Sequence, residues 1–261
     1  MKNLLMRLPK AELHCHLDGS MRPQTILDLA QIDGVDLGTT DLPLLKQRLV
    51  CGEKVRDLPQ FLTAFDITCS VLQTAHAIER IAFELAEDAH AEGVRYIEVR
   101  YSPYLTTQRG LSYDDTIRAV HRGLERAKDA YGIHSGQIIC ALRVLDPSIS
   151  IDLAIAAVNG KKYGVVGYDL AHAEKGNPPS IHAEAFRIAR EGGLGLTVHA
   201  GEAAGPDSIL DAIRSCGAQR LGHGLTLHQD RGLEDRVRTQ GIAIECCPSS
   251  NVQISLIPSH D

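Results

Sequence analysis

The sequence predicts an α/β fold built on a parallel sheet, and its polar residues favour a (β/α)8 barrel of the TIM type. From residue 94 onward, short apolar segments alternate with segments of helical period, as in a parallel sheet with crossover helices. Polar residues stand at the ends of several predicted strands, and a barrel gathers its chemistry at the carboxyl ends of its strands. A doubly wound open sheet is the competing architecture, but no G-x-G-x-x-G follows the first strand.

Seven of the eight strands of such a barrel are expected, without a linker between units. The predicted strands are Leu8–Leu17, Val94–Tyr101, Gln137–Leu145, Val165–Leu170, Leu194–Val198, Arg220–Leu221 and Ile242–Cys246. The predicted helices begin near Pro23 and then cover 42–49, 57–65, 74–92, 113–130, 149–158, 180–191, 208–216 and 230–239. We expect one domain over residues 1–261 that lacks the eighth β/α unit, with residues 32–70 inserted as a helical flap over the site.

The composition bounds the partners and the compartment. The chain has 261 residues, 44% of them hydrophobic, and a net charge of -6, so a basic field for nucleic acid or anionic membranes is absent. No apolar run reaches membrane-spanning length. The seven cysteines are odd in number and contain no C-x-x-C, which favours reduced thiols and a cytoplasmic protein.

The first strand carries a pair of histidines. His14 and His16 are two apart, so on a strand both imidazoles point to the same face and can bind one metal ion. Asp18 follows near the end of the strand. A bare His-x-His also arises by chance, so its weight depends on the rest of the chain.

Two later strand ends supply partners for that pair. His199 ends the fifth strand, Glu202 follows three residues later, and His223 ends the sixth. If the barrel closes, His14, His16 and His199 converge as ligands of one zinc ion, which lowers the pKa of bound water to about 7. Glu202 is then placed to exchange protons with a substrate, and His223 to orient the water or take its proton.

Several motifs together resemble the adenosine deaminase family of metal-dependent hydrolases, over almost the whole chain. The motifs are Glu12-Leu13-His14-Cys15-His16-Leu17-Asp18-Gly19, Glu98-Val99-Arg100-Tyr101-Ser102-Pro103, Val165-Val166-Gly167-Tyr168-Asp169-Leu170, Thr197-Val198-His199-Ala200-Gly201-Glu202, Arg220-Leu221-Gly222-His223-Gly224 and Cys247-Pro248-Ser249-Ser250-Asn251. The resemblance implies a (β/α)8 barrel that holds one zinc ion, with His14, His16 and His199 as ligands. It also implies that Glu202 protonates purine N1 and that His223 positions and deprotonates the attacking water.

The resemblance extends to substrate binding. It implies that Asp18 binds the ribose 5′ hydroxyl, where adenine-acting relatives tend to carry glutamate, so the nucleoside is favoured. The other expected substrate-binding residues are His16, Ser102, His172 and the helical flap residues Leu58, Phe61, Leu62 and Phe65. The stripe in this helix is also what plain core packing would produce.

Two departures from the family pattern are visible. His172 stands where the family usually has a glycine whose backbone N–H donates to the purine. The family's metal-binding aspartate follows an eighth strand in a Thr-Asp-Asp-like segment, whereas this sequence ends at Asp261. We therefore expect this form to be weakly stable, to bind zinc less tightly than a full-length relative and to deaminate adenosine poorly or not at all.

The leading hypothesis is zinc-dependent deamination of adenosine to inosine and ammonia. The alternatives are a deaminase of adenine or of an N6-substituted adenine nucleotide, and a noncatalytic relative that binds a purine or a protein. A cytidine-type zinc deaminase is disfavoured because no Pro-Cys-x-x-Cys pair is present.

Overall fold

The computed structural model describes residues 6, 8–49, 58–253 and 257, and of residues 58–63 it describes the backbone alone. The chain divides into two compact units. The first contains Met1–Val50, Leu62–Gln137 and Lys162–Gly164, and the second contains Cys51–Phe61, Ile138–Lys161 and Val165–Asp261.

The strands follow one another in the sheet in the order in which they occur in the chain. They are β1 (Lys10–His16), β2 (Val94–Tyr101), β3 (His134–Leu142), β4 (Val165–Ala171), β5 (Gly195–Ala200), β6 (Arg220–His223) and β7 (Ala243–Glu245). The pairs β1–β2, β4–β5, β5–β6 and β6–β7 are parallel. A strictly sequential parallel order, without the reversal of a doubly wound sheet, confirms the predicted (β/α)8 class.

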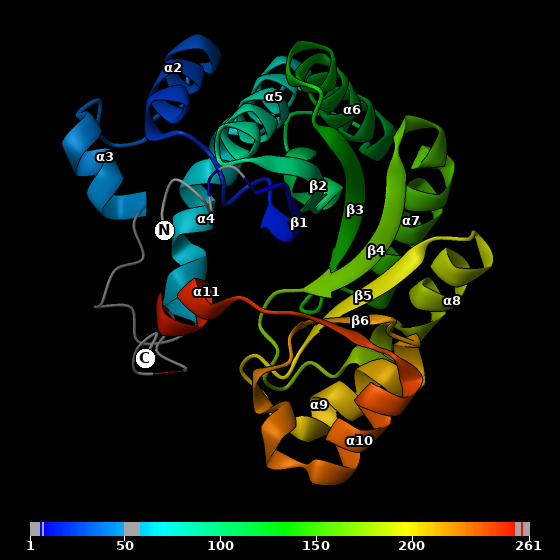
Figure 1. The fold of residues 1–261 in the computed structure, drawn as a ribbon. Coiled ribbons are helices and arrows are strands. Elements are labelled where there is room, and N and C mark those ends of the chain that lie inside the picture. The colour runs from blue at the N-terminus through cyan, green and yellow to red at the C-terminus, as the bar shows by residue number, and fades with distance from the viewer. Residues whose placement is uncertain (1–5, 7, 50–57, 254–256, 258–261) are drawn as a thin grey trace. The chain divides into compact units, whose positions relative to one another are not determined.

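Helices connect successive strands, as Figure 1 shows. The α-helices are α2 (Pro23–Asp33), α3 (Leu42–Leu49), α4 (Leu58–Val71), α5 (Ala75–Ala91), α6 (Tyr113–Tyr131), α7 (Pro147–Asn159), α8 (Ala183–Glu191), α9 (Pro206–Asp211), α10 (Arg231–Gln240) and α11 (Pro248–Gln253). Short 3-10 or π-helical turns are η1 (Pro103–Thr106), η2 (Gly160–Tyr163), η3 (Pro179–His182), η4 (Ala212–Cys216) and η5 (Leu225–Gln229). No helix in the described ranges is both long and apolar enough to cross a membrane.

Local sequence signals explain where several helices begin and end. Ser112 and Asp115 form a reciprocal capping box at the start of α6, and Gly132 ends that helix in the left-handed conformation. Asp230 caps α10 by accepting a hydrogen bond from the backbone N–H of Leu233. These caps satisfy backbone groups that the helix itself leaves unpaired.

In the first unit, α5 and α6 lie side by side (Figure 1). Their close approach depends on Gly123 of α6, because a Cβ atom there would lie 2.3 Å from the carbonyl oxygen of Glu79. The large apolar side chains on the buried faces of these helices and of β2 include Ile78, Ile81, Leu85, Ile97, Val99, Ile117, Val120 and Leu124.

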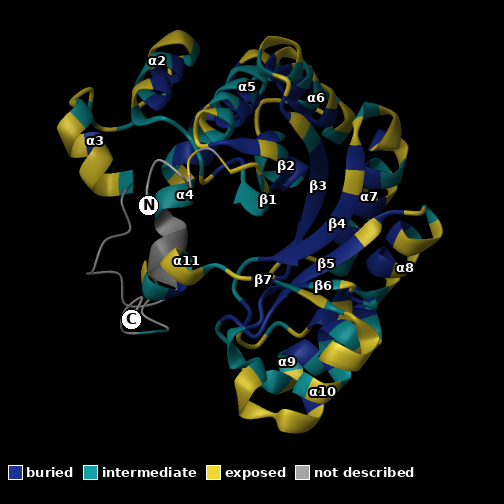
Figure 2. Cartoon of the chain, in the orientation of Figure 1, coloured by how far each residue is buried: buried dark blue, intermediate teal, exposed yellow. Residues whose placement is uncertain are grey.

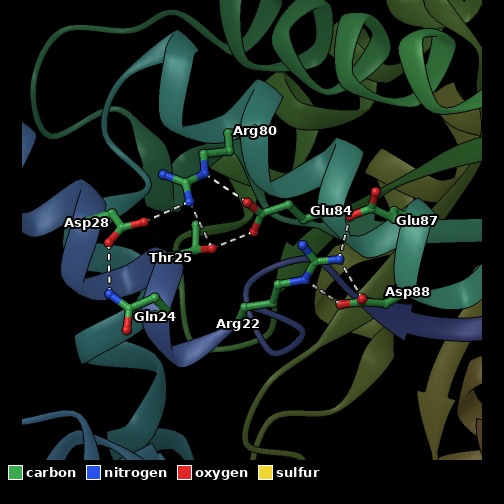
Figure 3. Close-up of polar contacts among 8 residues, drawn as sticks. All are labelled: Arg22, Gln24, Thr25, Asp28, Arg80, Glu84, Glu87 and Asp88. Carbon is green, nitrogen blue, oxygen red and sulfur yellow. Dashed lines mark hydrogen bonds and ion pairs between the residues drawn. The ribbon is translucent and has the colours of Figure 1, made fainter. Parts of the chain in front are cut away.

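A polar network joins α2 to α5 (Figure 3). Arg22 Nη2 lies 2.7 Å from a Glu87 carboxylate oxygen and 2.6 Å from one of Asp88. Arg80 of α5 reaches back to Asp28 of α2 at 2.9 Å. Within the first unit, α2 is therefore held against α5 by ion pairs at its start and near its middle.

The second unit packs α7 and α8 next to each other, and β4 is almost entirely buried (Figure 2). Tyr168 and Phe186 meet edge to face with their ring centroids 5.1 Å apart, a favourable aromatic geometry. The Tyr168 hydroxyl donates to the carbonyl oxygen of Ser150 at 2.6 Å, which satisfies its buried polar end.

The predicted element bounds hold best where apolar residues mark both ends. Strand β2 has the predicted limits, whereas β3 begins and ends three residues earlier than expected. The predicted helix over 208–216 begins at Pro206 and becomes π-helical from Ala212. Asp57, the first residue of the predicted helix over 57–65, lies outside the described residues.

Candidate active site

The histidine pair of β1 lies on one side of an irregular strand. The register between β1 and β2 shifts between Glu12 and Cys15, and the Glu12 side chain accepts a hydrogen bond from the backbone N–H of His14 at 2.9 Å. The imidazole centroids of His14 and His16 are 5.4 Å apart. The structure thus brings together the two predicted ligands of the first unit.

A fully buried arginine supports the same segment. Arg100 Nη2 donates to the carbonyl oxygen of Leu13 at 2.6 Å, and the Arg100 carbonyl accepts from the backbone N–H of Leu17 at 2.9 Å. Charge-assisted bonds of this kind are short and directional. The backbone on both sides of the histidine pair is therefore fixed by one residue of β2.

Two buried polar atoms that follow β1 and β2 make no hydrogen bond to the described residues. Asp18 Oδ1 and Ser102 Oγ have no hydrogen-bond partner among the residues described. Leaving such an atom unsatisfied costs about 1–3 kcal/mol, and native structures rarely do so without a functional reason. Burial raises the pKa of Asp18 from its ordinary 3.8 to about 6.

The predicted flap residues are only partly described. The Phe65 ring lies beside Gly19, where a Cβ atom would approach it to 3.4 Å, so it stands next to the end of β1. Leu58, Phe61 and Leu62 are in the helical backbone of α4, and their side chains lie outside the described residues.

In the second unit, a buried carboxylate holds the predicted ligand His199. The His199 Nδ1 atom lies 3.0 Å from Asp169 Oδ2 and 3.2 Å from Oδ1. Asp169 Oδ1 also accepts the backbone N–H of Leu170 at 2.7 Å. A carboxylate at Nδ1 keeps the imidazole hydrogen there, so Nε2 would be the atom that binds a metal ion, as in many zinc sites.

A second buried arginine fixes the backbone at His199. Arg143 Nη2 donates to the His199 carbonyl oxygen, and Nη1 donates to the Asn177 carbonyl oxygen at 2.9 Å. Burial lowers the pKa of Arg143. Arg143 thus holds the backbone at the end of β5 by a hydrogen bond to a carbonyl oxygen, as Arg100 does on β1.

The two predicted catalytic residues lie next to each other in the second unit. His223 Nε2 is 3.5 Å from Glu202 Oε1, and its Nδ1 is 2.9 Å from the amide oxygen of Asn251 in α11. An amide oxygen only accepts, so Nδ1 carries the hydrogen and Nε2 is basic. Burial lowers the pKa of His223, which favours the neutral, basic imidazole.

The backbone at His223 is strained. Its φ angle is 67°, in the left-handed region that residues other than glycine seldom adopt. Such strain costs about 1–3 kcal/mol and clusters at functional sites. Its ring centroid lies 5.4 Å from that of His199, so the metal-ligand candidate and the base candidate are neighbours.

His172 shares this unusual conformation, with a φ of 84°. This explains why a glycine suits the position. The imidazole Nδ1 accepts a hydrogen bond from the backbone N–H of Ala173 at 2.8 Å, and burial lowers the pKa of the half-buried ring. The side chain is therefore engaged with its own loop.

Four residues near the site escaped the sequence reasoning as contributors: Arg100, Arg143, Glu174 and Asn251. Each makes a hydrogen bond to a residue at least 27 positions away in the chain. The motifs around Arg100 and Asn251 marked these two as notable without indicating their partners.

The comparison with protein families identifies the class. The sequence pattern described as "Adenosine deaminase" matches residues 9–261. The chain belongs to the adenosine deaminase family, whose members are hydrolases that act on a C–N bond.

Curated relatives agree with this assignment. A probable adenosine deaminase of Dictyostelium discoideum is 44% identical over 98% of this chain, which spans about a third (33%) of that protein. Adenosine deaminases of Vibrio vulnificus (strain CMCP6) and Shewanella halifaxensis are 41% and 38% identical. Each match covers 97% of this chain and 76% of the relative.

Solved structures extend the comparison to other substrates. An adenine deaminase from Arthrobacter aurescens matches with a TM-score of 0.88 and 27% identity, covering 95% of this chain and 75% of that one. A Zn-bound amidohydrolase from Burkholderia ambifaria matches with a TM-score of 0.90 and 28% identity, over 98% and 70%. The N6-methyl-AMP deaminase of Arabidopsis thaliana matches with a TM-score of 0.84 and 25% identity, over 100% and 77%.

Proposed function

We propose that this protein is a zinc-dependent deaminase that converts adenosine and water to inosine and ammonia. The observation that carries the proposal is the pairing of Glu202 with His223 at 3.5 Å, beside a histidine whose Nδ1 is held by a carboxylate. This arrangement would supply an acid, a base and a metal ligand from neighbouring strand ends, as hydrolytic deamination requires.

We propose that three histidines hold one zinc ion. His14 and His16 would bind it from β1, where their rings lie on one side of the strand. His199 would bind it through Nε2, because Asp169 retains the hydrogen on Nδ1. Zinc bound there would act as a Lewis acid that activates water near neutral pH.

Purine recognition would use the unsatisfied polar atoms of the first unit. Asp18 Oδ1 is an acceptor for a ribose hydroxyl, and Ser102 Oγ offers a further hydrogen bond to the nucleoside. The backbone N–H of His172 would donate to the purine, with His16 contributing a contact. The flap residues Leu58, Phe61, Leu62 and Phe65 would cover the base.

The proposed chemical roles depend on which of the two catalytic residues donates a proton and which accepts one. Glu202 would protonate purine N1, which makes C6 electrophilic. His223 is held by Asn251 with Nε2 basic, so it can take a proton from the attacking water. The water oxygen would bond to C6 as the proton goes to His223. The C6–N bond would then break as His223 returns that proton to the leaving amine, which departs as ammonia, and the proton remaining on the new C6 oxygen would restore the Glu202 carboxyl.

The alternative substrates are adenine and N6-substituted adenine nucleotides. The matching adenine deaminase and N6-methyl-AMP deaminase structures support keeping both. Asp18 favours the nucleoside, because the family resemblance implies that an aspartate at this position binds the ribose 5′ hydroxyl. We place the enzyme in purine metabolism in the cytoplasm, a setting that suits six described cysteines joined by no disulfide.

The test is turnover by the metal-loaded chain with adenosine, adenine and N6-methyl-AMP as separate substrates. We expect inosine and ammonia from adenosine, with a smaller kcat/KM for the other two. Glu202→Gln should keep its zinc and lose turnover, because an amide cannot supply the proton for N1. Loss of zinc in Glu202→Gln would contradict the roles assigned to the residues. A preference for adenine or N6-methyl-AMP would contradict the assigned substrate.

A further inference from the structure

A buried carboxylate outside the predicted site binds the loop that carries Glu202. Glu174 follows β4 and is 3% exposed. Its Oε1 accepts the backbone N–H of Gly201 at 2.7 Å, and its Oε2 accepts those of Ala203 at 2.7 Å and Ala204 at 2.8 Å. Ser208 adds a fourth hydrogen bond through its hydroxyl, 2.6 Å from Oε1.

The bound amides flank Glu202 on both sides, since Gly201 precedes it and Ala203 follows it. The same loop is held through its carbonyl groups by Thr226, which follows β6. The Thr226 backbone N–H donates to the Gly201 carbonyl at 3.0 Å, and its hydroxyl donates to the Ala204 carbonyl at 3.0 Å. The Glu202 loop is thus fixed between the loops after β4 and β6.

We propose that Glu174 is a positioning residue, which holds the loop so that the Glu202 carboxyl is aimed at the purine ring. The inference rests on the proposed deaminase function and deepens it. A general acid contributes only when it lies within hydrogen-bonding reach of the atom it protonates, and the contribution is typically 10²–10⁴-fold. Rigid second-layer hydrogen bonds maintain such placement, and small displacements forfeit part of it.

Glutamine cannot replace Glu174 in this arrangement. All four partners donate, so both carboxylate oxygens act as acceptors. If the glutamine NH2 group replaces Oε2, it faces two backbone N–H groups. If it replaces Oε1, it faces the N–H of Gly201, because only the Ser208 hydroxyl can rotate to accept.

The test compares metal-loaded Glu174→Gln and Glu174→Asp with the control Asp207→Asn. Asp207 is exposed and next to Ser208, so its variant removes the same charge without touching the bound amides. We expect Glu174→Gln to lower kcat for adenosine about 10- to 100-fold with KM changed less than about 3-fold. We expect Glu174→Asp, which keeps four acceptor sites, to recover part of kcat, and Asp207→Asn to match the parent.

Two readouts separate positioning from a merely structural role. Hydrogen exchange by mass spectrometry should show faster exchange of a peptide covering residues 200–208 in Glu174→Gln and unchanged exchange in other peptides. The second readout is the partial recovery of kcat in Glu174→Asp, which keeps both acceptor oxygens and should also restore the slower exchange of residues 200–208. If Glu174→Gln fails to fold, Thr226→Val, which removes the hydroxyl donor on the opposite side, should lower kcat in the same selective manner.

The outcomes distinguish this inference from the proposed function. Absence of turnover in the parent chain on any purine overturns the proposed function and, with it, the role given to Glu174. Normal turnover in the parent together with unchanged kcat in Glu174→Gln overturns the positioning role alone. A fall in kcat with equally faster exchange throughout the chain also overturns it, because the effect is then general destabilisation.

Discussion

Replacing Asp169 by asparagine should convert His199 into the wrong tautomer for a metal ligand. Asp169 Oδ1 accepts the backbone N–H of Leu170 at 2.7 Å, so the new NH2 group cannot take that position without facing a donor. It must replace Oδ2, which lies 3.0 Å from His199 Nδ1, while the retained Oδ1 lies 3.2 Å from the same nitrogen. The new NH2 group is a donor beside Nδ1 and the negative charge of the carboxylate is lost, and both changes favour the tautomer with the hydrogen on Nε2, the proposed ligand atom.

The expected magnitude follows from the energetics of such supporting carboxylates. Their loss typically costs 10- to 100-fold in metal affinity, which corresponds to about 1.4–2.7 kcal/mol. Asp169 is fully buried, so water cannot replace the lost hydrogen bond. We therefore expect an effect of at least tenfold on the zinc dissociation constant.

Competition with a chromophoric chelator measures the zinc affinity of Asp169→Asn and of the parent at pH 7.5. Circular dichroism verifies the fold, since the chain contains no tryptophan for fluorescence. Asp235→Asn is the matched control, because this exposed residue of the second unit pairs only with Arg238 among the ion pairs described. Its zinc affinity should equal that of the parent.

An unchanged zinc affinity in a correctly folded Asp169→Asn variant would refute this reasoning. It would mean that Asp169 does not select the tautomer of His199. Weaker zinc binding in the Asp235→Asn control would instead indicate a general effect of charge.

Two predictions concern stability, each measured by urea unfolding with circular dichroism. Burial, followed by the charge of Arg143, leaves the pKa of His182 below its ordinary 6.5. Unfolding therefore takes up a proton as the pH falls below 6.5, and folding stability should fall by up to about 1.4 kcal/mol per unit of pKa difference. His182→Gln should reduce this dependence of folding stability on pH. The control is His134→Gln, which replaces an exposed histidine and should keep the pH dependence of the parent. An unreduced pH dependence in His182→Gln would contradict the assignment. Gly123→Ala should lower stability by about 1–3 kcal/mol or more, because its Cβ would lie 2.3 Å from the Glu79 carbonyl oxygen, and an unchanged midpoint would show that the helices separate easily.

The sequence by itself determined the fold class, and it is the source of the residues proposed for the site. Alternating apolar and amphipathic segments are a local property, so the order of β/α units and the limits of β2 could be predicted. The spacing of His14 and His16 predicted that they share a face, and the ring separation of 5.4 Å confirms it. The limits of β3 could not be read in the same way, because a polar start at His134 leaves no apolar signal.

Only the tertiary structure decided which residues support the chemistry. Asp169 and His199 are 30 residues apart in the chain, and His223 and Asn251 are 28 apart. Periodicity indicates which face a side chain occupies, but not which distant group will hydrogen-bond to it, since that depends on how neighbouring strand ends are brought together. The tautomers of both histidines depend on those long-range partners, and the polypeptide acquires them only when it folds.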